Sequence, residues 1–95
     1  MALRDITRSA VLRAVEEYDL NGRDAFLEKY RFGPARSYVL VIDGREYDSK
    51  AVVGAAHGYL PGLEPLGSDE FSGGRDHAAK LLTDLGFDVV TRGIG

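Results

Sequence analysis

The chain has 95 residues, no cysteine and two histidines, and its 12 Lys and Arg against 15 Asp and Glu leave a formal charge of −3. This length allows one small domain, and the lack of cysteine excludes disulfides, Cys-ligated zinc, iron–sulfur clusters and thiol catalysis. No apolar run approaches the roughly 20 residues of a membrane span, and no secretory signal opens the chain, so we expect a cytoplasmic protein. The acidic balance argues against nucleic-acid binding unless the basic residues gather locally.

The first third of the chain predicts two helices. Apolar residues recur at helical spacing between a candidate N-cap at Thr7 and a stop at Asn21-Gly22, namely Ala10, Val11, Ala14, Val15 and Tyr18. Arg8, Arg13, Glu16 and Glu17 lie off this apolar stripe. A shorter helix is expected over Arg23–Tyr30, and Gly33-Pro34 ends the helical region.

A hairpin follows. Tyr38–Ile42 is β-branched and aromatic, which is typical of a buried strand. Asp43-Gly44 predicts a two-residue turn, since a type I′ turn needs positive φ at both positions. Residues 45–47 form the return strand, and this register places Leu40 opposite Tyr47 and Ile42 opposite Arg45.

The second half predicts two further helices and a last strand. Asp48 is expected to cap a helix over residues 49–58, with an apolar stripe (Val52, Ala55, Ala56, Tyr59) and an opposite stripe (Lys50, Gly54, His57). A Gly/Pro-rich loop covers 60–67, and Ser72-Gly73-Gly74 leads into a helix that stops at Gly86. Residues 87–91 alternate as a strand that adds to the hairpin. The fold class is therefore α+β, with a three-stranded, mostly antiparallel sheet, about four helices and the order ααββααβ. We expect one domain over residues 1–91 and a tail over 92–95.

Two helix starts are candidate phosphate sites, because free backbone N–H groups and the positive end of the helix dipole favour anions. At the first, Ser49 and Lys50 share the helix with Gly54, which would permit close approach, and His57, which would donate. Alternatively, Gly54 lets another element pack closely and Lys50 is merely solvated. At the second, Ser72, Gly73 and Gly74 could expose consecutive N–H groups and Arg75 would add charge; a plain cap and turn is the alternative.

A third basic stretch runs from Lys29 to Ile42 and contains no acid. Arg31 and Arg36 alternate there with aromatic residues that could stack on bases or simply fill the core. Catalysis is not expected: Ser49 and His57 would stand about 12 Å apart along one helix, too far for a serine–histidine pair. No metal-ligand spacing is present, and we expect no cofactor.

The run from Arg36 to Tyr59, which contains Tyr47-Asp48-Ser49-Lys50-Ala51, and the later Phe71-Ser72-Gly73-Gly74 resemble a known module. It is the N-terminal domain of ScoMcrA-type, modification-dependent restriction endonucleases of actinomycetes and of related 5-methylcytosine-binding proteins. The resemblance covers nearly the whole chain. It implies a non-catalytic module that binds duplex DNA carrying methylated cytosine, while a separate HNH nuclease domain, to which such modules are fused, cuts.

In that interpretation the phosphate-binding residues are Arg31, Arg36, Ser49, Lys50, His57, Ser72, Gly73, Gly74 and Arg75. If the modified base flips out of the duplex, aromatic walls would come from Phe32, Tyr38, Tyr47 and Tyr59. Two other hypotheses remain: a protein-interaction or dimerisation module of a defence enzyme, which suits the acidic balance, and a small anion- or nucleotide-binding domain. Oligomeric state is not predicted.

Overall fold

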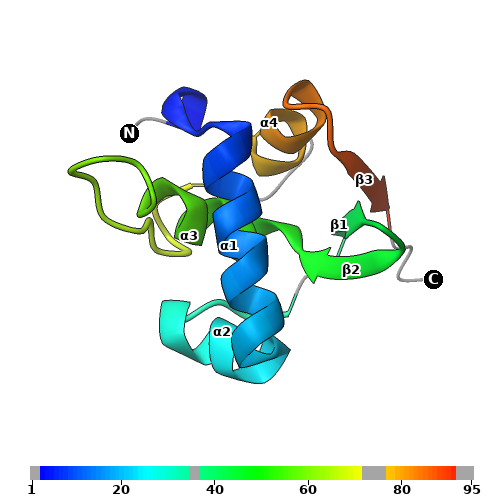
Figure 1. Cartoon of the computed structure of the whole chain (residues 1–95), viewed down its shortest axis with the longest axis horizontal. Coiled ribbons are helices and arrows are strands. Elements are labelled where there is room, and N and C mark those ends of the chain that lie inside the picture. The colour runs from blue at the N-terminus through cyan, green and yellow to red at the C-terminus, as the bar shows by residue number, and fades with distance from the viewer. Residues whose placement is uncertain (1–2, 35–36, 72–76, 92–95) are drawn as a thin grey trace.

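The protein was analysed as a computed structural model that describes residues 3–34, 37–71 and 77–91. A short 3-10 turn, η1 (Leu3–Asp5), precedes two helices, α1 (Arg8–Asn21) and α2 (Arg23–Tyr30). The hairpin strands β1 (Tyr38–Ile42) and β2 (Arg45–Asp48) lead into α3 (Ser49–His57). Helix α4 (Ala78–Asp84) and strand β3 (Asp88–Thr91) complete the described part (Figure 1). The predicted α+β class and the order ααββααβ are confirmed.

The three-stranded sheet is antiparallel throughout, in the order β2-β1-β3. Leu40 pairs with Tyr47 and Ile42 with Arg45, which confirms the predicted register. Asp43 and Gly44 both have positive φ, 52° and 79°, as the two-residue turn requires. The last strand pairs with β1 on its other side, as expected.

Helix α1 follows its sequence pattern closely. The side chain of Thr7 accepts a hydrogen bond from the backbone N–H of Ala10 at 3.1 Å, so the N-cap prediction is confirmed. All five residues of the predicted apolar stripe are buried. In Figure 1 this helix lies across the front of α3, with α2 below it and the sheet to one side.

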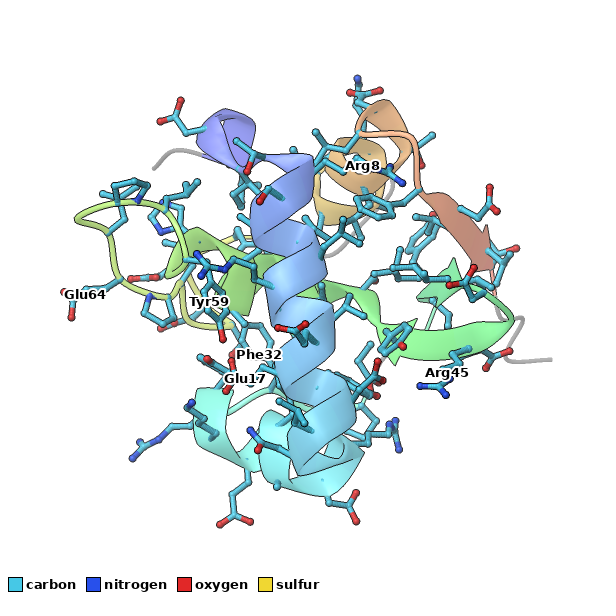
Figure 2. The ribbon with its side chains drawn as sticks, in the orientation of Figure 1. Arg8, Glu17, Phe32, Arg45, Tyr59 and Glu64 are labelled. Atoms are coloured by element: carbon cyan, nitrogen blue, oxygen red, sulfur yellow. The ribbon has the colours of Figure 1, made fainter. Side chains whose placement is uncertain are left out.

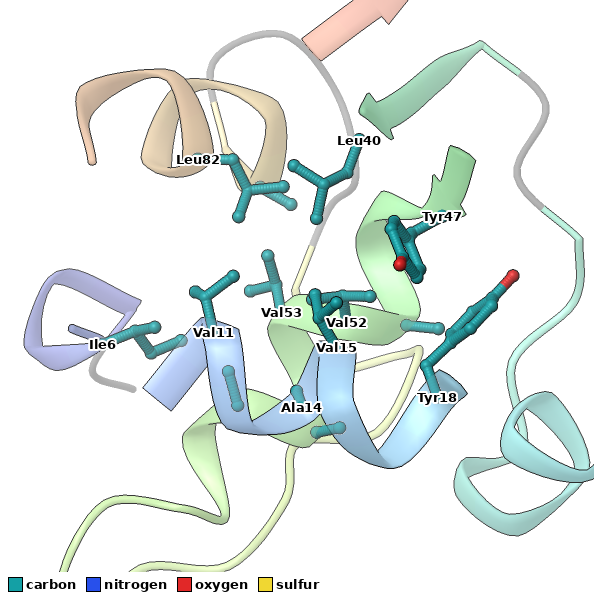
Figure 3. Packing of buried hydrophobic residues seen from close by; sticks show 14 of the residues in the cluster. Ile6, Val11, Ala14, Val15, Tyr18, Leu40, Tyr47, Val52, Val53 and Leu82 are labelled. Atoms are coloured by element: carbon teal, nitrogen blue, oxygen red, sulfur yellow. The ribbon is translucent and has the colours of Figure 1, made fainter. Parts of the chain in front are cut away.

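Helix α3 is the central element of the core. Every residue of it except Lys50 is buried, so the second stripe of the sequence pattern, with Gly54 and His57, also faces other parts of the domain. Figure 3 shows why: Val52 faces α1, while Val53 points toward Leu40 of β1 and Leu82 of α4. Small residues on the remaining positions let α1, α2, the sheet and the 60–71 loop all approach this one short helix.

Helix α4 starts at Ala78, with His77 at the N-cap position. The predicted entry to this helix, Ser72-Gly73-Gly74-Arg75, lies outside the described residues. The loop between α3 and α4 contains a turn in which the backbone N–H of Glu70 donates to the carbonyl of Gly67 at 3.1 Å. No helix in the described ranges is long and apolar enough to cross a membrane.

Candidate nucleic-acid interface

The N-terminal end of α3 is where the structure brings several predicted residues together. The ammonium group of Lys50 donates to the backbone carbonyl of Ser68 and lies 5.4 Å from the centre of the Phe71 ring. The Phe71 ring in turn lies 6.1 Å from the Phe32 ring, the residue after Arg31. Lys50 therefore stands beside Phe71, whereas the second predicted phosphate site, residues 72–75, lies outside the described residues.

Ser49 lies at the same end of α3 but is already committed to the fold. Its side chain is buried, and its hydroxyl donates to the backbone carbonyl of Tyr38 at 2.8 Å. This bond ties the start of α3 to the start of β1. We therefore assign Ser49 a structural role and remove it from the candidate phosphate contacts.

Asp48 occupies the N-cap position of α3 without capping it, which corrects the sequence prediction. Its carboxylate instead accepts hydrogen bonds from the Tyr18 hydroxyl at 2.7 Å and from the Arg23 guanidinium at 2.8 and 3.0 Å. Burial, together with the hydrogen bond to this carboxylate, raises the pKa of Tyr18, and the hydrogen bond to Asp48 raises the pKa of Arg23. Arg23 thus offsets a buried negative charge that would otherwise oppose an anion at the helix start.

Position 54 needs a glycine because other elements pack closely against it, not because a ligand approaches it. A Cβ at this position would lie 2.6 Å from an atom of the Phe32 ring and 2.7 Å from the Leu66 carbonyl oxygen. The Leu66 N–H also donates to the Gly54 carbonyl at 3.0 Å. The alternative that another element packs closely against Gly54 is therefore the one that the structure supports.

His57 and Tyr59 lie at the opposite end of α3 from Lys50. His57 is 7% exposed, and its Nδ1 donates to the backbone carbonyl of Glu64 at 2.6 Å; because a carbonyl can only accept, this nitrogen carries the proton. The bond holds the loop over residues 60–67 against the helix. Seven residues separate His57 from Lys50, about 10 Å along the helix axis, so the structure does not bring these two side chains into one site.

The predicted aromatic walls do not assemble into a pocket. Phe32 and Tyr47 are core residues, 7% and 4% exposed. The Tyr47 hydroxyl donates to the Asp19 carboxylate, and the Tyr59 hydroxyl donates to Glu17. Tyr38, half-buried at the start of β1, is the candidate wall whose hydroxyl has no hydrogen-bond partner among the described residues.

Glu17 was expected on the surface of α1, but it anchors three elements (Figure 2). Its side chain is 10% exposed and accepts hydrogen bonds from Lys29 at 2.6 Å, Tyr30 at 2.6 Å and Tyr59 at 2.7 Å. Burial alone raises the pKa of Glu17, but these three donors outweigh it and the pKa is lowered. Burial and the Glu17 carboxylate raise the pKa of Tyr59 to about 12. No local sequence pattern predicts this cluster, because its members come from α1, α2 and the turn that follows α3.

Ion pairing separates the basic side chains into two groups. Among the described residues, four basic side chains form salt bridges with carboxylates: Arg23, Lys29, Arg45 and Lys80. Arg8, Arg13, Arg31 and Lys50 have no carboxylate partner in the same ranges. Arg31 is exposed and has a positive φ of 60° where α2 ends. The remaining predicted residues, Arg36, Ser72, Gly73, Gly74 and Arg75, lie outside the described residues.

This arrangement provides the groups that hold a phosphate. Lys50 supplies a fixed ammonium and Arg31 an exposed guanidinium, and the start of α3 contributes the positive end of a helix dipole. A sequence search for basic residues beside aromatic ones finds Arg31, which precedes Phe32, whereas Lys50 meets Phe71 only in the folded structure. It cannot distinguish Lys50 from ion-paired cations such as Arg23, whose partner lies 25 residues away.

Comparison with protein families matches residues 4–91 to a family described as the ScoMcrA-like, N-terminal head domain. Among solved structures, this chain is similar to one described as "Structure of the Type IV phosphorothioation-dependent restriction endonuclease ScoMcrA", with 34% sequence identity and a TM-score of 0.70. The similarity covers 95% of this chain and 14% of that chain. A comparison with curated proteins found no match.

Proposed function

Because this chain belongs to the family of ScoMcrA-like N-terminal head domains, we propose that it binds duplex DNA for a modification-dependent restriction enzyme and does not itself cut. The observation that carries this proposal is its similarity, at 34% identity over 95% of the chain, to part of a restriction endonuclease. The resemblance of residues 36–59 and 71–74 supported the same function from sequence. Cleavage would reside in the part of such an enzyme that this chain does not match.

The contact with DNA is made at phosphate groups by the face that carries Lys50 and Arg31. Lys50 is held in place by the Ser68 carbonyl, so little side-chain entropy is lost when it meets a phosphate. Arg31 has no competing carboxylate among the described residues, so its guanidinium can donate two parallel hydrogen bonds to phosphate oxygens. Arg36 and Arg75 are proposed to extend this face.

The modification itself could lie on the base or on the backbone. The sequence resemblance suggested 5-methylcytosine, whereas the solved relative is described as phosphorothioation-dependent, a modification in which sulfur replaces a phosphate oxygen. A flipped base needs an open aromatic pocket, but Phe32 and Tyr47 are buried in the core and Tyr59 is bonded to Glu17. These observations favour a domain that contacts the backbone over one that encloses a methylated base.

The test uses three labelled duplexes of one sequence: unmodified, 5-methylated at cytosine, and phosphorothioated. Fluorescence anisotropy at about 50 mM salt should show binding of all three, with no gain in affinity from the methyl group. All duplexes should stay intact when Mg²⁺ is added. Absence of binding at this salt concentration would refute the proposal, and a tenfold preference for the methylated duplex would restore base recognition and refute the backbone argument.

A further inference from the structure

The outer face of α1 carries a second group of basic residues, separate from Lys50 and Arg31. A shallow hollow of about 380 Å³ is lined by Arg8, Ser9, Leu12, Arg13 and Glu16. All five residues belong to the exposed side of α1, opposite the stripe that packs into the core. Two arginines and a hydroxyl around one hollow are the donors that phosphate groups meet in proteins.

Both arginines are held by aromatic rings. The guanidinium of Arg8 lies 4.3 Å from the centre of the Phe87 ring, and its Nη1 donates to the carbonyl of Leu85 at 2.9 Å. Figure 2 shows Arg8 against the turn that joins α4 to β3. The guanidinium of Arg13 lies 5.7 Å from the centre of the Tyr59 ring, and that ring is fixed by its bond to Glu17.

These contacts orient the two guanidinium groups without neutralising them. An aromatic face and a carbonyl oxygen carry no net charge, and neither arginine has a carboxylate partner among the described residues. Most of the N–H donors of each guanidinium therefore remain available. Glu16, the fifth lining residue, contributes the opposing charge and leaves the hollow with a net charge of +1.

The hollow faces away from the Lys50 side of the domain. Val52 of α3 faces α1 (Figure 3), and Lys50 lies two residues earlier, about 200° around the helix. Lys50 therefore points away from α1, whereas the hollow lies on the far side of α1 from α3. A duplex held at Lys50 and Arg31 would leave Arg8 and Arg13 uncovered.

We propose that the α1 hollow binds a phosphate group, and that in the context of the proposed function this is a phosphate of a nucleic-acid backbone. Arg8, held on the Phe87 side, and Arg13, held on the Tyr59 side, supply the positive charge, and Ser9 supplies a hydroxyl to the lining of the hollow. The domain would then have two DNA-facing sides, so that it can contact a second stretch of duplex while the Lys50 face is occupied. This assignment rests on the proposed function for its ligand, but the site itself can be tested with free phosphate.

The test measures backbone amide shifts of the labelled protein in NMR titrations with inorganic phosphate and, separately, with an unmodified duplex. Wild-type protein should show shifts at Ser9, Leu12 and Arg13 in both titrations. Arg13→Gln should weaken binding at these amides about threefold or more, whereas Glu16→Gln should strengthen it, because it removes the one opposing charge. The charge-matched controls are Lys80→Gln and Asp24→Asn, which change the same charges at exposed positions elsewhere.

The site is supported if Arg13→Gln weakens binding at the α1 amides, Glu16→Gln strengthens it, and neither control changes it much. If the duplex binds and shifts only amides near Lys50 and Arg31, and phosphate leaves the α1 amides unmoved, the inference is overturned and the proposed function stands. If phosphate shifts the α1 amides but no duplex binds, the hollow is a site for a free phosphate group and the proposed function fails. Arg8→Gln gives an independent check, with a thermal melt to show that the turn at Leu85 still folds.

Discussion

Replacing Gly54 by alanine tests the packing of α3 because two effects of opposite sign compete. In a free helix, alanine is about 1 kcal/mol more favourable than glycine. Here its Cβ would lie 2.6 Å from the Phe32 ring and 2.7 Å from the Leu66 carbonyl oxygen, about 1 Å closer than atoms at ordinary contact distance. The Phe32 ring is backed by Phe71, and the Leu66 carbonyl is backbone, so neither can move away freely.

Overpacking costs about 1–3 kcal/mol, and contacts this short, one of them with a backbone oxygen, belong to the upper part of that range. After the gain of about 1 kcal/mol from alanine is subtracted, we expect Gly54→Ala to lower the free energy of unfolding by about 1–2 kcal/mol. In a domain of this size that corresponds to a fall in Tm of roughly 5–10 °C. Urea unfolding followed by circular dichroism measures it. The matched control is Gly33→Ala, where a Cβ meets nothing within 4 Å; it should leave stability unchanged or slightly raised. A stabilised Gly54→Ala would refute the account of α3 as a helix packed closely on every side.

Three further predictions concern the side-chain clusters. Asp48→Asn should lower the free energy of unfolding by about 2 kcal/mol in urea unfolding, because the charged hydrogen bonds from Arg23 weaken. The pKa of Glu17 is lowered in the folded protein, so Glu17 stabilises the fold fully above pH 4.5, its ordinary pKa, and this stabilisation is lost as the pH falls through the lower folded pKa. Thermal melts should therefore show a Tm that declines as the pH falls below 4.5. Glu17→Gln should make this decline smaller. Lys50→Gln should weaken duplex binding in anisotropy measurements, whereas Lys80→Gln, whose ion pair is exposed on both sides, should not.

Local patterns predicted most of the fold because local physics determines it. The Thr7 cap, the apolar stripe of α1 and the Asp43-Gly44 turn each depend on residues within a few positions of one another. The predictions failed where contacts between residues far apart in the sequence determine what a side chain does. Asp48 looked like a cap, but Tyr18 and Arg23, 30 and 25 residues earlier, take its carboxylate.

The candidate site shows the same limit. Lys50 and Gly54 were both predicted from the sequence to belong to the first candidate phosphate site. Phe32 and Leu66 pack on Gly54, whereas among the described residues the ammonium of Lys50 meets a carbonyl and a ring. No pattern along the chain distinguishes these two cases, because the elements that cover Gly54 come from the end of α2 and from the loop after α3. Arg8 and Arg13 were identified only as residues off the apolar stripe, since the rings of Phe87 and Tyr59 that orient them are far away in sequence.

The most direct test of the central claim is a salt titration of duplex binding by the wild-type chain and by Lys50→Gln. Each phosphate contact contributes about −0.9 to the slope of log affinity against log salt concentration. With few cations on the proposed face, we predict measurable binding at low salt, a shallow negative slope for the wild type, and a slope smaller by about 1 for Lys50→Gln. No binding at low salt, or identical slopes for the two proteins, would contradict a DNA-binding domain that holds phosphates at Lys50.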